Sequence, residues 1–453
     1  MLVGRGLIIR LVTWGTTLAM LRWVTPTDLG VLAATQALFG LTGFVAEWGY
    51  TSYLIRRRAG PGATELAAFA SVQLAVALVV IAAILAAPSS LFDAWLGVPG
   101  GKALLVVVAI GGVFAYGHNG SKAVLEREMN FAVLARIDVA MLFVQNVILM
   151  IAAVSGRFVS GIPVALVTAA LIGTAMFAIH VPRAWRLTLD IRPLGAGLKD
   201  ASAFAAAGLA DTLNRSLLPL AISNLFGLAI LGSWSVATRF GQISLVVFES
   251  FWRAGFPAAS RLAHEREMLD RLTQSSFRRA LRLSTPIALL VVIGAPLMAP
   301  LFPLWTPAIV AAQVWSVAYA AAGSVSAAVS PRQIALTGPR ILVIELVSVF
   351  AVTLGLLALL GFWQSPLAVA VAFSGGAVAG VVVWFASAGG PMVRALMADA
   401  VIEGGALVVV GLAVLLGSSW GNSSPAIIAA AVGLTVLVIV RRPWISRPEW
   451  LRR

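Results

Sequence analysis

Apolar runs of about twenty residues follow one another along nearly the whole chain, each ended by a charged, glycine-rich or proline-rich break. A helix of that length crosses the roughly 30 Å hydrocarbon layer of a bilayer. With 60% hydrophobic and only 11% charged residues, a chain of 453 residues has more apolar surface than a soluble domain can bury. Long alternation of apolar and polar residues, typical of a membrane barrel, is not found. We therefore expect an all-α polytopic membrane protein.

The breaks predict about fourteen transmembrane helices, each close to the length needed to span the membrane. The N-terminal helix follows basic residues and could be mistaken for a signal peptide, but no small-residue cleavage pattern follows it, so we expect it to be retained. The expected helices cover residues 4–22, 30–54, 65–87, 102–121, 131–154, 162–182, 201–223, 228–251, 283–302, 308–330, 340–361, 366–387, 397–417 and 425–441.

Basic residues are distributed unequally between the loops on the two sides of these helices. Of the 32 Lys and Arg residues, three fall in loops on one side and three within helices, and the rest share a side with both ends of the chain. The positive-inside rule makes that side cytoplasmic. We therefore predict a multi-pass protein of the inner or plasma membrane with both termini in the cytoplasm. The exceptions are Arg22, Lys102 and Arg157 in outside loops, and Arg136, Arg215 and Arg239 within helices.

Composition and loop length argue against several classes of function. The chain has no cysteine, and its three histidines lack metal-ligand spacing, so we predict no thiol chemistry, no metal and no cofactor. The loops are too short to fold a catalytic domain, which disfavours a polysaccharide polymerase or ligase, and we predict neither catalytic residues nor enzyme activity. The net charge of +14 comes from arginines between apolar segments, so nucleic acid is not an expected partner.

A basic segment containing Pro and Gly near the middle of the chain indicates a linker between two halves. The halves echo each other: "DLGVLAATQALFG" in the first resembles "AILGSWSVATRFG" in the second, which aligns Gly30 with Gly232. Such internal repeats are common in transporters. The predicted domains are an N-terminal six-helix lobe at 1–183, a cytoplasmic linker at 184–200, a second six-helix lobe at 201–388, and two additional helices with a basic tail at 389–453.

Charged residues within the segment "GLADTLNRSLLPLAISNLFG" raise the question of function most directly. A charge at the centre of a bilayer costs at least about 2.5–3.5 kcal/mol on insertion scales, so Asp211 and Arg215 should face protein or a water-filled cavity. They lie four residues apart and share a helix face. One hypothesis is mutual neutralisation. The other is a cationic lumen in which Arg215 and Arg239 bind an anionic headgroup, with Asp211 and Asn214 supporting the site or taking part in ion coupling.

Weaker candidates lie in other expected helices. Arg10 can either extend to the membrane surface or join the headgroup site. Glu47 lies in an otherwise uncharged span and is either a proton or sodium site or an interhelical hydrogen-bonding group. Residues that can stack on a sugar or bond its hydroxyls form a third group: Trp48, Trp234, Gln36 and Gln242.

Five stretches resemble, in the correct order, the Wzx-type polysaccharide flippases: "LRWVTPTDLGVLA", "FVAEWGYTSYLIRR", "LEREMNFAVLARIDV", "ILGSWSVATRF" and "FPAASRLAHEREMLDRLTQSSFRRAL". The resemblance covers about residues 5–285. It implies the fold of the multidrug/oligosaccharidyl-lipid/polysaccharide exporters, which has two six-helix lobes around a central cavity and, here, two extra helices. One departure is Ser233 followed by Trp234, where the family often has an aromatic residue, more usually Tyr, directly or one residue after the helix glycine.

The resemblance implies a flippase that moves a polyprenyl-diphosphate-linked oligosaccharide to the outer face of the membrane by alternating access, for O-antigen, capsule or exopolysaccharide synthesis. Its implied partners are this substrate, membrane lipid, and the polysaccharide polymerase and export machinery; coupling to H⁺ or Na⁺ is open. The alternatives on the same fold are cation-coupled multidrug efflux and a peptidoglycan-precursor flippase. Two buried arginines against one aspartate favour an anionic substrate over cationic drugs, and the "TPTDLG" turn favours polysaccharide.

Overall fold

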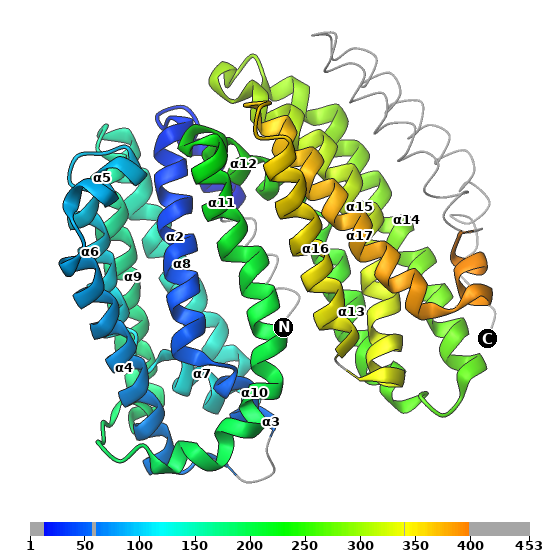
Figure 1. Cartoon of the computed structure of the whole chain (residues 1–453), viewed down its shortest axis with the longest axis horizontal. Helices are drawn as coiled ribbons and strands as arrows, with labels where there is room; N and C mark the ends of the chain where they lie inside the picture. The colour runs from blue at the N-terminus through cyan, green and yellow to red at the C-terminus, as the bar shows by residue number, and fades with distance from the viewer. Residues whose placement is uncertain (1–12, 57–59, 339, 398–453) are drawn as a thin grey trace. The chain divides into compact units, whose positions relative to one another are not determined.

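The computed structural model describes residues 13–56, 60–338 and 340–397, and within these ranges the chain is helical without a β-strand (Figure 1). In this part of the chain, seven helices are long and apolar enough to cross a membrane. An eighth span results if α5 (Ser89–Leu96) and α6 (Gly101–Phe114), which are bent by 93° at their junction, count as one. The expected all-α, multi-pass class is confirmed.

Eleven expected helices coincide with helical segments of the structure, but the full count of fourteen stays a prediction. Only the last part of the expected helix at 4–22 is described, and those at 397–417 and 425–441 lie almost wholly outside the described residues. Several described helical segments are not among these spans, and three of them, at 218–226, 228–241 and 245–261, are shorter than the 18 residues required.

The chain divides into two compact units, Met1–Gly232 and Ser233–Arg453. The division falls later than the predicted linker at 184–200, because the helices after that linker pack against helices of the first unit. In chain order the first unit contains α2 (Pro26–Glu47), α3 (Tyr50–Arg56), α4 (Ala63–Ala86), α5, α6, α7 (His118–Arg127), α8 (Phe131–Val154), α9 (Phe158–His180), the short turn η1 (Pro182–Trp185), α10 (Arg192–Thr212), the π-helical turn η2 (Leu213–Leu217), α11 (Leu218–Phe226) and the start of α12 (Leu228–Gly241).

Helix α2 begins in the "TPTDLG" motif because that motif satisfies the N–H groups left open at a helix start. The backbone N–H of Asp28 donates to Thr25 Oγ1 at 3.2 Å, and the backbone N–H of Thr25 donates to Asp28 Oδ2 at 3.0 Å. These reciprocal bonds form a capping box, and Pro26 occupies the first helical turn, where it costs no hydrogen bond. The acidic residue of the turn therefore has a local structural role.

Two glycines that the sequence echo aligns lie in a close crossing of α2 with the first turn of α12. A Cβ added to Gly30 would lie 2.0 Å from the carbonyl oxygen of Leu228, and a Cβ added to Gly232 would lie 1.8 Å from that of Pro26. The contact is reciprocal: each glycine lies against the carbonyl group of the residue four positions before the other glycine. Small residues let helix backbones approach this closely in membranes.

The expected helix at 30–54 is broken into α2 and α3. Trp48 and Gly49 both adopt left-handed backbone conformations there, with φ of 43° and 69°. Gly49 also lies against α10, since an added Cβ would be 2.7 Å from the backbone nitrogen of Ala205. Only glycine meets both requirements without strain. The break thus turns α3 onto α10.

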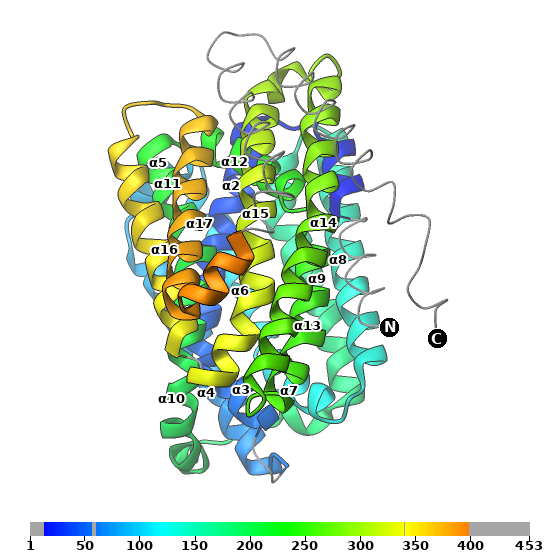
Figure 2. The ribbon, with the colours of Figure 1, turned by 90° about the vertical axis from the view of Figure 1, so that its right-hand side faces the viewer.

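The second unit contains the rest of α12, α13 (Leu245–Arg261), α14 (Arg266–Met298), the turn η3 (Pro303–Trp305), α15 (Thr306–Thr337), α16 (Arg340–Leu359) and α17 (Pro366–Ala388), and residues 390–397 are also helical. Helix α15 packs against α13, α14 and α17, and α16 packs on α17 (Figure 2).

The basic segment between Arg253 and Arg282 does not form a separate helix of its own. Its first part belongs to α13, and its second part is the start of α14, which continues without interruption through the expected span at 283–302. Arg332 of α15 holds this extension through its Nε, which lies 2.8 Å from Asp270 Oδ1, and the Arg332 side chain is only 8% exposed. The ion pair therefore makes the amphipathic segment part of the bundle.

Candidate functional site

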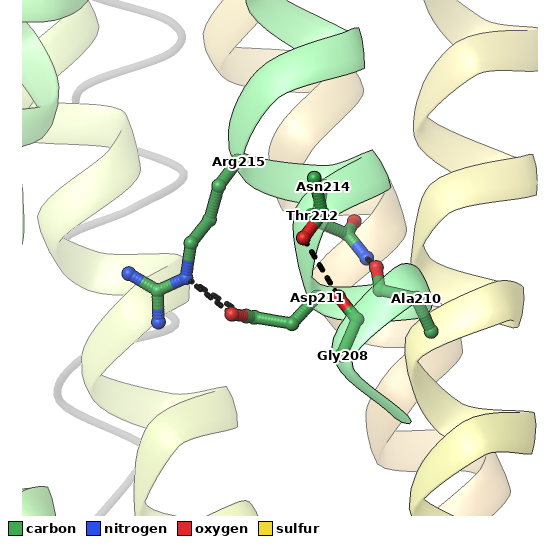
Figure 3. Close-up of polar contacts among 6 residues, drawn as sticks. All are labelled: Gly208, Ala210, Asp211, Thr212, Asn214 and Arg215. Carbon is green, nitrogen blue, oxygen red and sulfur yellow. Dashed lines mark hydrogen bonds and ion pairs between the residues drawn. The ribbon is translucent and has the colours of Figure 1, made fainter. Parts of the chain in front are cut away.

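Asp211 and Arg215 form an ion pair at the junction of α10 and η2 (Figure 3). The Nε–H of Arg215 donates to both carboxylate oxygens, at 2.8 Å each. Within its unit the pair is exposed, with 76% of the Arg215 side chain and 47% of the Asp211 side chain accessible. The carboxylate therefore orients the guanidinium without covering it.

The π-helical turn that carries Arg215 has a cause in the sequence. Pro219 has no N–H to donate and its ring collides with the carbonyl group four residues earlier, which is that of Arg215. The helix widens instead, and the N–H of Leu218 bonds the carbonyl oxygen of Leu213, five residues back. Such widened turns are frequent at functional sites.

Another side of this turn packs on α2. Ser216 is 4% exposed, and a Cβ added to Gly40 of α2 would lie 2.6 Å from Ser216 Oγ. Leu218 and Ile222 continue the buried side along α11. Ser216 faces α2, whereas the side chain of the neighbouring Arg215 is exposed, so the ion pair lies beside the face of the helix that packs on α2.

Asn214 and Thr212 bond back to their own helix. Asn214 Nδ2 donates to the carbonyl oxygen of Ala210 at 2.9 Å, and Thr212 Oγ1 donates to that of Gly208 at 2.7 Å (Figure 3). These bonds satisfy backbone carbonyls beside the π-helical turn. Asn214 therefore supports the distorted helix that presents Arg215, and its part in ion coupling stays a prediction.

Arg239 and Gln242 lie in the second unit, at the end of α12 and just beyond it. Both side chains are partly buried, and the N–H of Gln242 donates to the carbonyl oxygen of Thr238. Arg215 belongs to the first unit and Arg239 to the second, so each arginine is placed within its own unit. Their common role in binding a headgroup stays a prediction.

Trp234 is buried, with 3% of its surface exposed. Its ring lies 4.5 Å from that of Phe373 and 5.7 Å from that of Trp315, measured between centroids. In this conformation Trp234 therefore supports other aromatic rings, and a direct contact with sugar requires those rings to move. Trp48 differs, since it is 45% exposed and lies 5.9 Å from the Phe44 ring at the end of α2.

Gln36 borders a cavity of about 360 Å³ within the first unit, between α2, α4, α6, α7 and α9. Uncharged hydrogen-bonding groups gather in its wall: Gln36, Thr42, Gln73, Tyr116 and Asn119. Asn119 Nδ2 donates to Gln73 Oε1 at 3.3 Å. The cavity offers amides and hydroxyls, which can bond a polar uncharged group, and it contains no carboxylate among the described residues that line it.

Glu47 is the last residue of α2 and is partly exposed, next to the break at Trp48 and Gly49. Its role in ion coupling or in an interhelical hydrogen bond stays a prediction. Arg10 lies outside the described residues. Within the described part of the chain, no group of three or more His, Asp or Glu residues is placed to hold a metal ion.

Two carboxylates that the sequence did not single out as a pair border one cavity of the second unit. Glu249 lies on α13 and Glu345 on α16, and aromatic side chains surround them. Glu345 lies near the start of α16, where an acidic side chain has an ordinary structural explanation. The only signal for a further role was an acid inside an apolar span, which does not reveal its partner.

These features define an α-helical, multi-pass membrane protein. A family model described as "Polysaccharide biosynthesis protein" matches residues 19–304, more than half of the chain, so the protein belongs to that family. The family predicted from the five sequence stretches is therefore confirmed. A search of curated proteins gave no match.

The solved structures that share this fold include a flippase and a multidrug transporter. The lipid II flippase MurJ, in an inward closed conformation, matches with a TM-score of 0.68 and 14% identity over 97% of this chain and 98% of its own. An inward-facing multidrug resistance MATE family transporter of the MOP superfamily matches with a TM-score of 0.63 and 16% identity over 86% of this chain and 99% of its own. At these identities the likeness establishes the fold alone.

Proposed function

We propose that this protein is a flippase that carries a polyprenyl-diphosphate-linked oligosaccharide from the cytoplasmic to the outer face of the inner or plasma membrane. Membership of a polysaccharide biosynthesis family supports the polysaccharide substrate, and the fold shared with MurJ and MATE transporters supports translocation. Transport needs binding and a shift between two conformations, with no covalent bond broken.

The observation that carries this proposal is the exposed guanidinium of Arg215, which pairs with Asp211 between the uncharged stretches 201–210 and 216–227. An arginine in contact with lipid is costly, so this face is expected to meet water, substrate or protein. The carboxylate of Asp211 engages Nε, and the two terminal nitrogens of the guanidinium have the geometry that bonds phosphate oxygens in pairs. Arg215 would thus bind the diphosphate, with Arg239 adding positive charge.

In this mechanism the headgroup enters from the cytoplasmic side while the prenyl tail stays in lipid. The π-helical turn fixes the direction in which Arg215 projects, and Asp211 limits its rotamers, so less conformational entropy is lost on binding. Coupling to H⁺ or Na⁺, a cytoplasmic position of both termini, and cooperation with a polymerase and export machinery belong to the same proposal.

The test is headgroup translocation in proteoliposomes containing the full chain and a fluorescent polyprenyl-diphosphate oligosaccharide. Arg215→Gln and Arg239→Gln are expected to lower the rate at least about tenfold, since each removes a charge-assisted bond worth about 1.5–3 kcal/mol. Arg271→Gln is the matched control, because Arg271 also pairs with an acid four residues earlier and its side chain is also 76% exposed.

Unchanged translocation by folded Arg215 and Arg239 variants would place the headgroup site elsewhere. Two further substrates separate the alternatives. Movement of a peptidoglycan precursor in place of the oligosaccharide lipid would make the protein a precursor flippase. Extrusion of a cationic dye without movement of either lipid would make it an efflux transporter.

A further inference from the structure

The second unit contains a cavity of about 490 Å³ between α13, α15, α16 and α17. This volume lies within the usual range for small-molecule sites, which is about 300–1,000 Å³. Six aromatic side chains line it: Phe248, Trp252, Trp315, Tyr319, Phe373 and Trp384. The proposed binding of the diphosphate at Arg215 does not involve this cavity.

The rings pack on one another at several angles, which gives the cavity a firm aromatic wall. The centroid of Trp315 lies 5.2 Å from that of Tyr319 and 5.9 Å from that of Phe373, the latter in an edge-on arrangement. Phe248 is seated against Gly323, where an added Cβ would lie 2.2 Å from its ring. Rings held by packing provide contact area with little loss of entropy on binding.

Two carboxylates project from different helices into this aromatic environment, those of Glu249 and Glu345. Gly380 of α17 makes room for one of them, because an added Cβ would lie 3.1 Å from Glu345 Oε1. Among the described residues that line the cavity there is no lysine or arginine. An anionic diphosphate is therefore disfavoured here, and the cavity is chemically distinct from the Arg215 site.

Aromatic rings with carboxylates suit either an organic cation or a sugar ring. The indole nitrogens of Trp315 and Trp384 favour the sugar. Both N–H groups are buried and find no hydrogen-bond acceptor among the described residues. A small movement of either ring would let a sugar oxygen accept these bonds, whereas a cation offers no acceptor.

We infer that this cavity binds a neutral or amino-sugar ring of the translocated glycan, with the apolar face of the sugar on the aromatic rings and its hydroxyls donating to Glu249 and Glu345. The inference rests on the proposed function, since it takes its ligand from that substrate. The cavity would select the glycan, while Arg215 binds the diphosphate common to all such lipids. Acidic sugars are repelled by the two carboxylates.

Saturation-transfer NMR on the full chain in nanodiscs tests this directly. The probes are methyl glucoside, N-acetylglucosamine and glucuronate, and the two neutral sugars are expected to bind at least about tenfold more tightly than glucuronate. Trp252→Leu and Glu345→Gln should each weaken neutral-sugar binding about tenfold, which corresponds to about 1.4 kcal/mol. Trp363→Leu should leave it unchanged, because Trp363 lies outside the cavity and is exposed to the same 41% as Trp252.

Absence of saturable sugar binding above empty nanodiscs would overturn the inference, as would binding that both cavity variants retain. Binding of tetraphenylphosphonium in place of sugar, lost in Glu345→Gln, would make the cavity an organic-cation site. If the Glu345→Gln variant does not fold, the Trp252→Leu variant still tests the inference, because Trp252 is exposed. Lipid translocation by the same preparation separates the two ideas: translocation without sugar binding refutes only this inference, and sugar binding without translocation refutes only the proposed function.

Discussion

The crossing of α2 and α12 at Gly30 and Gly232 allows a quantitative prediction. An added Cβ at either position would lie 2.0 Å or less from a backbone carbonyl oxygen, whereas real Cβ atoms essentially never approach closer than 3.0 Å. Since neither neighbour is a flexible side chain, the helices must separate by about 1 Å. Overpacking of this kind costs about 1–3 kcal/mol.

The same substitutions also improve helix propensity, which offsets up to about 1 kcal/mol. We therefore expect Gly30→Ala and Gly232→Ala each to destabilise the protein by about 1–2 kcal/mol. Gly355→Ala in α16 is the control, because an added Cβ there meets nothing within 4 Å, and it should be neutral or stabilising. Unfolding in mixed micelles by a denaturing detergent, followed by tryptophan fluorescence, measures the differences.

The double variant tests the geometry more strictly than either single one. Both substitutions push apart the same pair of helices, so the second should add little once the first has separated them. Additive energies would show that the two glycines do not share one crossing. Single variants as stable as Gly355→Ala would refute the close approach itself.

Two further predictions concern ion pairing and helix distortion. Arg332→Gln removes the bond to Asp270 from a side chain that is 8% exposed, so the free energy of unfolding in the same assay should fall by about 1–3 kcal/mol. The exposed control Arg271→Gln should lower it by less than about 1 kcal/mol, and equal effects of the two variants would contradict the prediction. Pro219→Ala restores a backbone donor and should convert the π-helical turn to an α-helix, which would turn the Arg215 side chain by about 100° around the helix. The translocation rate should fall at least severalfold without loss of stability, and translocation at the wild-type rate would contradict the prediction.

Some features of the site were predictable because they depend on sequence spacing alone. Asp211 and Arg215 lie four residues apart in a helix, so their pairing follows from helix geometry. The π-helical turn was not predicted, although Pro219 was visible in the sequence. The roles of Trp48 and Trp234 diverged for a tertiary reason, since one ends a helix in the open and the other lies under neighbouring rings.

The sequence by itself determined the class of protein, the approximate positions of eleven helices and the family. It could do so because a membrane-spanning helix needs a long apolar run, and that run is local in the chain. Only the tertiary structure decided that the Arg215 side chain is exposed, that α14 is one continuous helix, and that Glu249 and Glu345 share a cavity. The reason is that helices apolar on every side have no periodic pattern to show which face meets which neighbour.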